Sequence, residues 1–303
     1  MSKFTLRQLE LFVALADFRT LSQAASSLHF SESALSQAIT RLENSVGEQL
    51  CIRRKAHGLQ LTPAGEYFAL RARQLLGSAE DLASDMSGAN GELKGPVKLG
   101  CFASFAASVL PAILDGFPKL HPGVVVEVVV GTHDELLPAL GSGQLDLAIV
   151  YDMELPPGLQ RRSIYETELQ AILAPDHPLA RQETVDLAQL APEPLIMYES
   201  SPSTANTYRV FAERGLRPSV VSHMPQVILV QGLVGRGLGY GLLMSRPNCV
   251  PVTMEGLPLA VRSLEPPAGR TSMVGIWPEH LRLGPRAQAL LDFAVDTFRS
   301  PDD

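Results

Sequence analysis

The chain has 303 residues, of which 46% are hydrophobic and 19% are charged, and its formal net charge is −7. The length predicts two domains, or three if one is small, and the composition excludes wholesale disorder, a collagen-like chain and a coiled coil alone. Cys51, Cys101 and Cys249 stand far apart with no CxxC pair, which excludes a disulfide scaffold and a cysteine-rich zinc site and is typical of a reducing cytosol. The first residues lack the apolar core of a secretory signal, and no apolar stretch is long enough to span a membrane. We therefore expect a cytoplasmic protein with no membrane partner.

The charge is unevenly distributed along the chain. Residues 1–75 hold 9 Lys+Arg and 6 Asp+Glu, a local charge of +3, whereas the remainder holds 16 basic and 26 acidic residues, a local charge of −10. An N-terminal region of this kind is able to contact DNA through a small basic patch although the whole chain is acidic.

Three short helices are predicted at the N-terminus, over residues 6–16, 21–28 and 32–45. Thr20 and Ser31 are suited to cap the second and third helices, and Gly47 is suited to the left-handed position that ends the third. Because only a tight break at residues 29–31 separates the second helix from the third, the pattern predicts a helix-turn-helix.

The third helix divides into an apolar face and a polar face. The polar face carries short hydrogen-bonding side chains and a single charge: Ser33, Ser36, Gln37, Thr40 and Arg41. Such side chains are able to approach base edges and phosphates in the major groove. The alternative interpretation is an ordinary amphipathic helix on the protein surface.

A β-hairpin is predicted next, because two apolar runs at residues 50–52 and 59–61 flank a turn that holds Arg53, Arg54, Lys55, His57 and Gly58. A basic loop is usually solvated surface. Directly behind a helix-turn-helix, however, it is typical of the wing of a winged helix, which contacts the DNA backbone or minor groove.

A long helix follows, capped by Thr62 with Pro63 at its first position, and extends to about Met86. One side of it is an apolar stripe: Phe68, Leu75, Leu76, Ala79, Leu82, Ala83 and Met86. Two interpretations are open, packing within its own domain and pairing with a second subunit, and we favour the dimer seam.

The composition changes around residues 91–96, and from there apolar runs alternate with helical segments. This alternation predicts βαβ units and a largely parallel sheet that is buried on both faces, with strands that include residues 124–131, 145–151 and 250–255.

No catalytic or cofactor motif is present. There is no GxSxG, HExxH, P-loop or kinase pattern, and the glycine-rich run from Gly235 to Gly241 fails the dinucleotide fingerprint. The histidines show no metal-ligand spacing, and Cys101 is interpreted as a buried hydrophobe with a redox sensor as the alternative. We therefore expect no catalytic residue, metal or cofactor. An enzyme with an appended DNA-binding or dimerising module is the second candidate, and a solute-binding protein the third.

One family resemblance covers essentially the whole chain. The N-terminal segment LRQLELFVALADFRTLSQAASSLHFSESALSQAITRLENSVGEQL, with its following arginines and LTPAGE, resembles the LysR-type transcriptional regulators, and the following 210 or so residues are similar to their effector domain. The resemblance implies a mainly α winged helix-turn-helix (residues 1–61), a linker and dimerisation helix (62–90), and an α/β effector domain (91–303). That domain would consist of two Rossmann-like halves resembling type 2 periplasmic binding proteins: half I at about 94–166 and 267–303, and half II at about 167–266.

The resemblance also implies partners. We expect a homodimer or homotetramer of a bacterial regulator that binds an interrupted palindrome in double-stranded DNA, contacts RNA polymerase, and responds to a small-molecule effector in the cleft between the halves.

Site residues follow from the same resemblance. The DNA-binding set is Ser31, Glu32, Ser33, Ser36, Gln37, Thr40, Arg41, Arg53, Arg54 and Lys55. The dimerisation set is Phe68, Leu75, Ala79, Leu82 and Met86. The effector set is Ala103, Ser104, Phe105, Thr132, Tyr151, Tyr198, Ser201, Ser203 and Gln226. For the hydroxyls of Ser104 and Thr132, capping of the helices that follow is the alternative.

Three positions depart from the family pattern. Glu32 stands where the family often has glutamine, and a carboxylate there repels phosphate but is able to accept from cytosine N4. Cys51 replaces a phenylalanine before the wing arginine. Tyr151 falls where some members that bind aromatic acids have an arginine, so the sequence favours a neutral or singly anionic effector.

Overall fold

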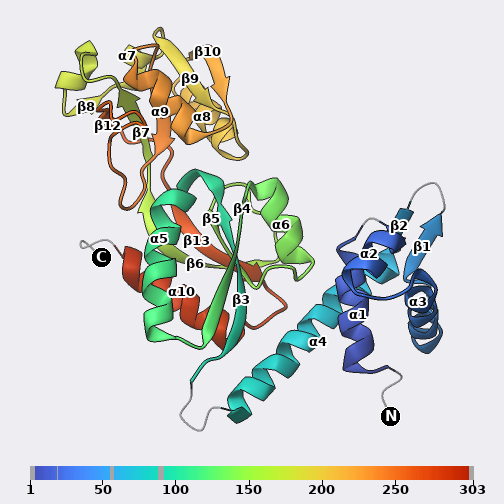
Figure 1. Ribbon diagram of the computed structural model, residues 1–303. Helices are drawn as coiled ribbons and strands as arrows, with labels where there is room; N and C mark the ends of the chain where they lie inside the picture. The colour runs from blue at the N-terminus through green and yellow to red at the C-terminus, as the bar shows by residue number, and fades with distance from the viewer. Residues whose placement is uncertain (1–3, 19, 55–57, 88–91, 300–303) are drawn as a thin grey trace.

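The computed structural model describes residues 4–18, 20–54, 58–87 and 92–299, and of residues 53, 54, 80, 81 and 83–87 it describes the backbone only. Figure 1 shows the N-terminal domain, the long helix α4 and the two halves of the effector domain as successive parts of the chain. Within the described ranges, no helix combines the length and the apolar character that crossing a membrane requires.

The N-terminal domain contains helices α1 (Leu6–Ala16), α2 (Leu21–Ser27) and α3 (Glu32–Val46). Each helix begins at a hydroxyl side chain that accepts from a backbone N–H two or three residues into the helix: Thr5 from Gln8, Thr20 from Gln23, and Ser31 from Ala34. Gly47 ends α3 with a left-handed φ of +86°, as the sequence predicts. The apolar faces of the helices meet in one small core, which includes Phe12, Leu35, Ile39 and Leu42.

The wing is an antiparallel hairpin of β1 (Cys51–Arg54) and β2 (Gly58–Leu61), in which Cys51 pairs with Leu61. Glu43 attaches the wing to α3, because its Oε1 accepts from the backbone N–H of Leu50 at 2.9 Å and of Cys51 at 3.0 Å. At the start of α4, a Cβ on Gly65 would lie 2.0 Å from the carbonyl oxygen of Leu50. Only glycine allows this approach.

Helix α4 (Pro63–Ser87) begins at Thr62, whose hydroxyl accepts from Gly65 N at 2.9 Å. Phe68 packs within its own domain, with its ring 5.7 Å from that of Phe4 and 5.4 Å from that of Phe12. Leu75 and Leu82 are 48% and 64% exposed. The predicted stripe therefore divides into an inner end that contributes to the N-terminal core and an outer end that faces solvent within this chain.

Half I of the effector domain is a five-stranded sheet in the order β4-β3-β5-β13-β6. Its strands are β3 (Gly95–Phe102), β4 (Val124–Gly131), β5 (Leu147–Tyr151), β6 (Leu159–Thr167) and β13 (Thr271–Pro278). Helices α5 (Ala103–Leu120) and α10 (Pro285–Phe298) lie together on one side of the sheet, and α6 (His133–Gly141) lies on the other (Figure 1). Phe117 of α5 and Phe293 of α10 make the contact between their helices, with ring centroids 5.7 Å apart.

Half II holds the sheet β11-β7-β12-β8 and the parallel pair β9 and β10. Its strands are β7 (Leu169–Leu173), β8 (Thr184–Val185), β9 (Pro194–Tyr198), β10 (Ser219–Met224), β11 (Gly241–Met244) and β12 (Ala260–Leu264). Its helices are η1 (Pro178–Arg181), α7 (Leu187–Leu190), α8 (Ser203–Glu213) and α9 (Val227–Gly235). The chain passes between the halves twice, from β6 to β7 and from β12 to β13.

Three details of the predicted effector domain are wrong. Its sheets are mixed, because β13 is antiparallel to β5 and β7 is antiparallel to β11 and β12. The strand over residues 124–131 lies at an edge and leaves Val125, Val129 and Val130 at least 49% exposed. Residues 250–255 form no regular strand, because the hydroxyl of Thr253 accepts from the backbone N–H groups of residues 255 and 257 and turns the chain.

Candidate DNA-binding surface and effector cavity

Helix α3 presents its polar face outward. Leu35, Ile39 and Leu42 are at most 2% exposed on the inner face. The outer face bears a shallow hollow of about 300 Å³, which is lined by Ser36, Gln37, Thr40 and Arg41. Four of the five residues predicted to face DNA bases therefore border one continuous surface of the helix.

The other predicted residues of α3 lie at its first turn. The hydroxyl of Ser31 caps the helix and lies 3.1 Å from the hydroxyl of Ser33. Glu32 is exposed in the first turn, where a carboxylate stabilises the positive end of the helix dipole. Ser31 and Glu32 thus have a structural role that is independent of DNA.

The wing residues are placed by their backbone. Arg53 pairs with Leu59 and Arg54 with Gly58 in the hairpin. The side chains of both arginines, the whole of Lys55 and the side chain of Met86 in the dimerisation set lie outside the described residues.

Two adjoining cavities lie between the halves of the effector domain. The inner one is about 10 Å³, room for about one water molecule, and the outer one is about 440 Å³, within the size range of small-molecule sites. Both are lined by Ser104, Tyr198, Val227 and Arg246. Because Ser104 belongs to half I and the other three to half II, a molecule bound here contacts both halves.

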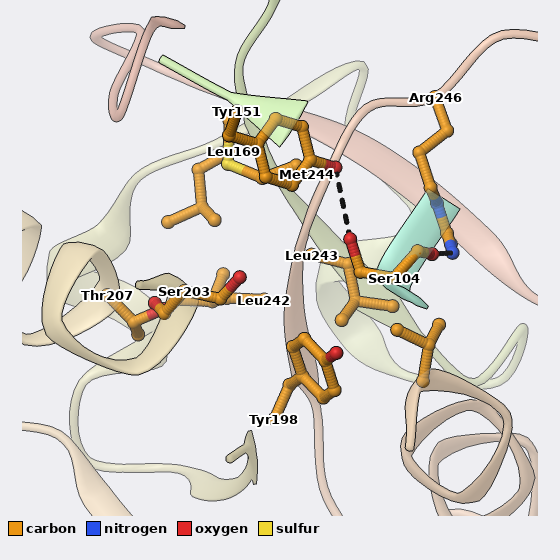
Figure 2. Close-up of a pocket in the computed structure, with 11 residues that line it drawn as sticks. Ser104, Tyr151, Leu169, Tyr198, Ser203, Thr207, Leu242, Leu243, Met244 and Arg246 are labelled. Carbon is orange, nitrogen blue, oxygen red and sulfur yellow. Dashed lines mark hydrogen bonds between the residues drawn. The ribbon is translucent and has the colours of Figure 1, made fainter. Parts of the chain in front are cut away.

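The structure brings most of the predicted effector residues to these cavities. Ser104, Tyr151, Tyr198 and Ser203 line the inner cavity, and Ala103 and Gln226 line the outer one together with Ser104 and Tyr198. Figure 2 shows Ser203 and Thr207 on one side of the inner cavity and Ser104 and Arg246 on the other.

The remaining three effector residues lie elsewhere. Phe105 is 1% exposed and packs against Tyr151 with ring centroids 5.0 Å apart, so it supports the cavity wall from behind. Thr132 begins α6, and its backbone N–H and hydroxyl bond to Glu135 at 2.8 and 3.2 Å. This is the capping alternative that the sequence left open. Ser201 is exposed and lines neither cavity.

Arg246 lines both cavities but is not among the predicted effector residues. It lies two residues after the end of β11, and its Nη1 donates to the carbonyl oxygen of Ser104 at 2.9 Å, a contact across 142 positions of the chain (Figure 2). No motif marks this arginine. The available signal was its position at the end of an apolar run, but only the fold shows that this strand end faces half I.

The two tyrosines of the cavity are phenols at neutral pH. Burial raises the pKa of Tyr151 to about 12, although the hydrogen bond from Ser104 and the charge of Arg246 oppose the shift. Burial likewise raises the pKa of Tyr198. Both hydroxyls are therefore able to donate as well as accept hydrogen bonds.

Burial also determines the state of Cys101, which is 0% exposed and whose pKa is raised by burial, so the group is a thiol rather than a reactive thiolate. Within the part of the chain that the structure describes, no group of three His, Cys, Asp or Glu side chains is arranged to hold a metal ion.

Comparisons with known proteins place the chain in a family. The model of the bacterial regulatory helix-turn-helix protein, lysR family, matches residues 6–66, and the model of the LysR substrate binding domain matches residues 90–299. The transcriptional regulator ShiR of Corynebacterium glutamicum is 31% identical, with 97% of this chain and 99% of ShiR covered. Among solved structures, HinK, a LysR family transcriptional regulator from Pseudomonas aeruginosa, is 30% identical with a TM-score of 0.64, and the match covers 97% of this chain and 98% of HinK.

A third relative is a mutant of the OxyR protein of Corynebacterium glutamicum, solved bound to H2O2, which is 26% identical with a TM-score of 0.61 over 96% of this chain and 90% of that chain. Together with the geometry above, these matches establish the assignment. The chain belongs to the LysR family and is a DNA-binding transcriptional regulator with an effector-binding C-terminal domain.

Proposed function

We propose that this regulator reads its operator through the outer face of α3 and is controlled by a small molecule bound between the halves of its effector domain. The observation that carries the proposal is the continuous hollow lined by Ser36, Gln37, Thr40 and Arg41 on the helix that follows the tight turn. Arginine forms bidentate contacts with guanine and glutamine with adenine, and serine and threonine hydroxyls add single hydrogen bonds. The wing arginines Arg53 and Arg54, with Lys55, add phosphate contacts that are independent of sequence.

The base-reading role is tested by Gln37→Ala, with Gln189→Ala as a matched control because Gln189 is exposed on α7 of half II. The Gln37 variant is expected to lose about 1–3 kcal/mol of operator binding relative to scrambled DNA, and the control to lose none. Gel-shift titration of both variants against the upstream region of the protein's own gene measures the difference. A Gln37 variant that discriminates as well as the parent would remove this residue from the interface.

The assembly that we propose is a homodimer or homotetramer in which the outer part of α4 pairs with the same helix of a second chain. Leu75 and Leu82 support this role, because they are large apolar side chains of α4 that are about half exposed or more within one chain. Leu75→Asp would bury an unpaired carboxylate in the seam and is expected to reduce the dimer fraction in sedimentation. Met254→Asp is the matched control, at a residue 83% exposed on half II.

We also propose where this regulator acts and which partners it contacts. A regulator of this kind acts in the cytoplasm on an interrupted palindrome and contacts RNA polymerase, and it carries out no catalysis of its own. The relatives that match almost the whole chain are named transcriptional regulators, which supports this interpretation over an enzyme. The buried Cys101 thiol offers no support for a redox role at that position.

A further inference from the structure

Arg246 is a positively charged side chain that lines both effector cavities. Its guanidinium donates to the carbonyl oxygen of Ser104 at 2.9 Å, and its Nη2 lies 3.7 Å from the sulfur of Cys249. Among the described residues, no carboxylate lies within salt-bridge distance of it. A guanidinium carries five N–H donors and no acceptor, so most of its hydrogen-bonding capacity is open to a ligand.

The lining of both cavities contains no Asp or Glu among the described residues, although the whole chain has a net charge of −7. The polar groups that accompany Arg246 are neutral hydroxyls and amides, such as those of Ser104, Tyr198 and Gln226. Acidic side chains are thus excluded from the one place where they would neutralise this arginine.

Three helices begin at the cavities, and none of them carries a side-chain cap. Helix α5 begins beside Ser104, α8 begins at Ser203, and α9 follows Gln226, and in each case no side chain accepts from the first turn. The first N–H groups of a helix lack partners within the helix, and the helix dipole places partial positive charge there. The N-terminal ends of α5 and α9 therefore add to the field of Arg246 at the outer cavity.

Away from the cavities the same chain caps its helices. Thr5, Thr20, Ser31 and Asp186 cap α1, α2, α3 and α7, and Glu135 reaches back to the N-terminus of α6. The missing caps are thus confined to the helices that border the cavities and to α10, which begins with proline at its first position.

The lining of the outer cavity combines an apolar part with neutral polar side chains, among them Ser108, Gln231 and Asn248. The apolar part includes Val227, Ile228, Val250 and Val252, together with two alanines of α5. A cavity of about 440 Å³ accommodates a ring or a short chain, with its charged end at Arg246.

From these observations we infer that the effector of this regulator is a small monocarboxylate, whose carboxylate pairs with Arg246 at the N-terminus of α5 and whose apolar body packs against the apolar part of the outer cavity. The inference rests on the proposed function, since it names the ligand of that site. One guanidinium together with uncapped helix ends balances a single negative charge, whereas a phosphate monoester carries between one and two charges at neutral pH. The positive charge therefore comes from Arg246, after β11, and not from position 151, where some members of the family have an arginine and this chain has a tyrosine.

The test uses the full-length protein and pairs of probes that differ only in charge: benzoate with benzamide, and hexanoate with hexanamide. Calorimetric titration at millimolar probe concentration is expected to show at least one carboxylate bound at least 10-fold more tightly than its amide. Arg246→Gln should weaken that carboxylate by about 10- to 100-fold and leave the amide unchanged, the range expected for losing a hydrogen bond to a charged group. Arg246→Lys should retain part of the preference.

Arg236→Gln is the matched control, because Arg236 lies at the end of α9, is 59% exposed and pairs with Glu255 rather than with the cavities. Carboxylates that bind no better than their amides, an Arg246→Gln variant with an unchanged preference, or stronger binding of inorganic phosphate would each overturn the inference. Gel shifts of the same variants without probe keep the two proposals separable. Normal operator binding together with no carboxylate preference would reject the ligand class while leaving the DNA-binding proposal intact.

Discussion

The N-terminal domain and the effector domain use the ends of their helices in opposite ways. In the first, hydroxyl side chains close α1, α2 and α3, and the functional groups stand on the outer face of α3. In the second, α5, α8 and α9 leave their first N–H groups without side-chain caps at the cavities. A DNA reader needs a rigid helix that presents side chains, whereas a small-ligand site gains from backbone donors held in place by the fold. Hydroxyl side chains therefore stabilise the helix ends of the N-terminal domain, whereas the helix ends at the effector cavities keep backbone N–H groups available to a ligand.

The largest expected effects come from substitutions in the two hydrophobic cores, one in the N-terminal domain and one in half I of the effector domain. Leu35 is 0% exposed in the N-terminal core, and Leu136 is 0% exposed in half I. Either leucine replaced by alanine is expected to cost about 2–5 kcal/mol, from lost burial and the cavity left behind. Leu35→Ala should abolish operator binding and keep probe binding in the effector domain, and Leu136→Ala should do the reverse. Urea unfolding with gel shift and calorimetry measures both, and simultaneous loss of both activities in either variant would show one cooperative unit instead.

Acid should weaken the effector domain through His133, the first residue of α6, which is 3% exposed beside the ring of Phe102. Burial lowers the pKa of His133 from 6.5 to about 4, against a smaller opposing effect of Asp134. The unfolded chain then binds more protons than the folded chain between these two pKa values, so the free energy of unfolding falls as pH drops below about 6.5. At pH 5 the expected loss is about 2 kcal/mol, since one pKa unit corresponds to about 1.4 kcal/mol.

The parent and His133→Asn should therefore differ in the pH dependence of the effector-domain transition, with the smaller loss between pH 7.5 and pH 5 in the variant. Denaturant unfolding at the two pH values, followed by a probe of the effector domain, measures this difference. Equal slopes in parent and variant would show that the imidazole is protonated as readily in the folded chain as in the unfolded one.

The sequence predicted the N-terminal domain best, because its helix ends depend on residues that lie close together in the chain. The bounds of the first three helices, the role of Ser31 as a cap and of Gly47 as a stop were all predictable, because each depends on residues within a few positions. Glu43 was not, since its role is to hold the backbone of Leu50 and Cys51, which only the folded wing brings to it.

The outcome for the effector residues depends on a local signal at Thr132 and on long-range geometry at Arg246. The hydroxyls of Ser104 and Thr132 stand in similar positions after strands, yet the first lines both cavities whereas the second bonds to Glu135. The glutamate three residues after Thr132 was the signal for a capping box, and it separates the two cases from sequence alone. Arg246 had no such signal, because its contact with Ser104 depends on how the two halves are joined.

Two substitutions at helix ends, one in each domain, should have smaller effects and compare the two kinds of helix end directly. The hydroxyl of Thr20 accepts from Gln23 N at 3.2 Å, so Thr20→Ala should cost the N-terminal domain about 1 kcal/mol. Ser104→Ala removes a hydroxyl that caps nothing and whose hydrogen bond to the Tyr151 hydroxyl is long, at 3.5 Å. It should therefore change the free energy of unfolding of the effector domain by less than about 0.5 kcal/mol. Thermal unfolding of the two variants measures both values. Equal losses would mean that the Ser104 hydroxyl stabilises the folded effector domain, through α5 or through Tyr151, and is not reserved for a ligand.

The smallest expected effect concerns a polar contact between the N-terminal domain and half I within one chain. Arg73 of α4 donates through Nη1 to the carbonyl oxygen of Ser142 at 2.8 Å and through Nη2 to Oδ1 of Asp17 at 2.9 Å. Gln144 donates to the same oxygen of Asp17 at 3.0 Å. The end of α1, the linker helix and the loop after α6 therefore meet at one carboxylate oxygen.

Asp17→Ala removes that oxygen. The Asp17 side chain is 50% exposed, and the Arg73 side chain, which is 12% exposed, keeps its bond to Ser142, so the expected cost is about 1 kcal/mol. This effect is informative although it is small, because it reports on the coupling between the two domains. The contact lies between the domains, so its loss should leave each core intact and separate the thermal transitions of the two domains further. Asp115→Ala is the matched control, since Asp115 forms an exposed ion pair with Lys119 within α5. Differential scanning calorimetry should show a wider gap between the transitions for Asp17→Ala than for the control. An unchanged gap would mean that the two domains are coupled elsewhere.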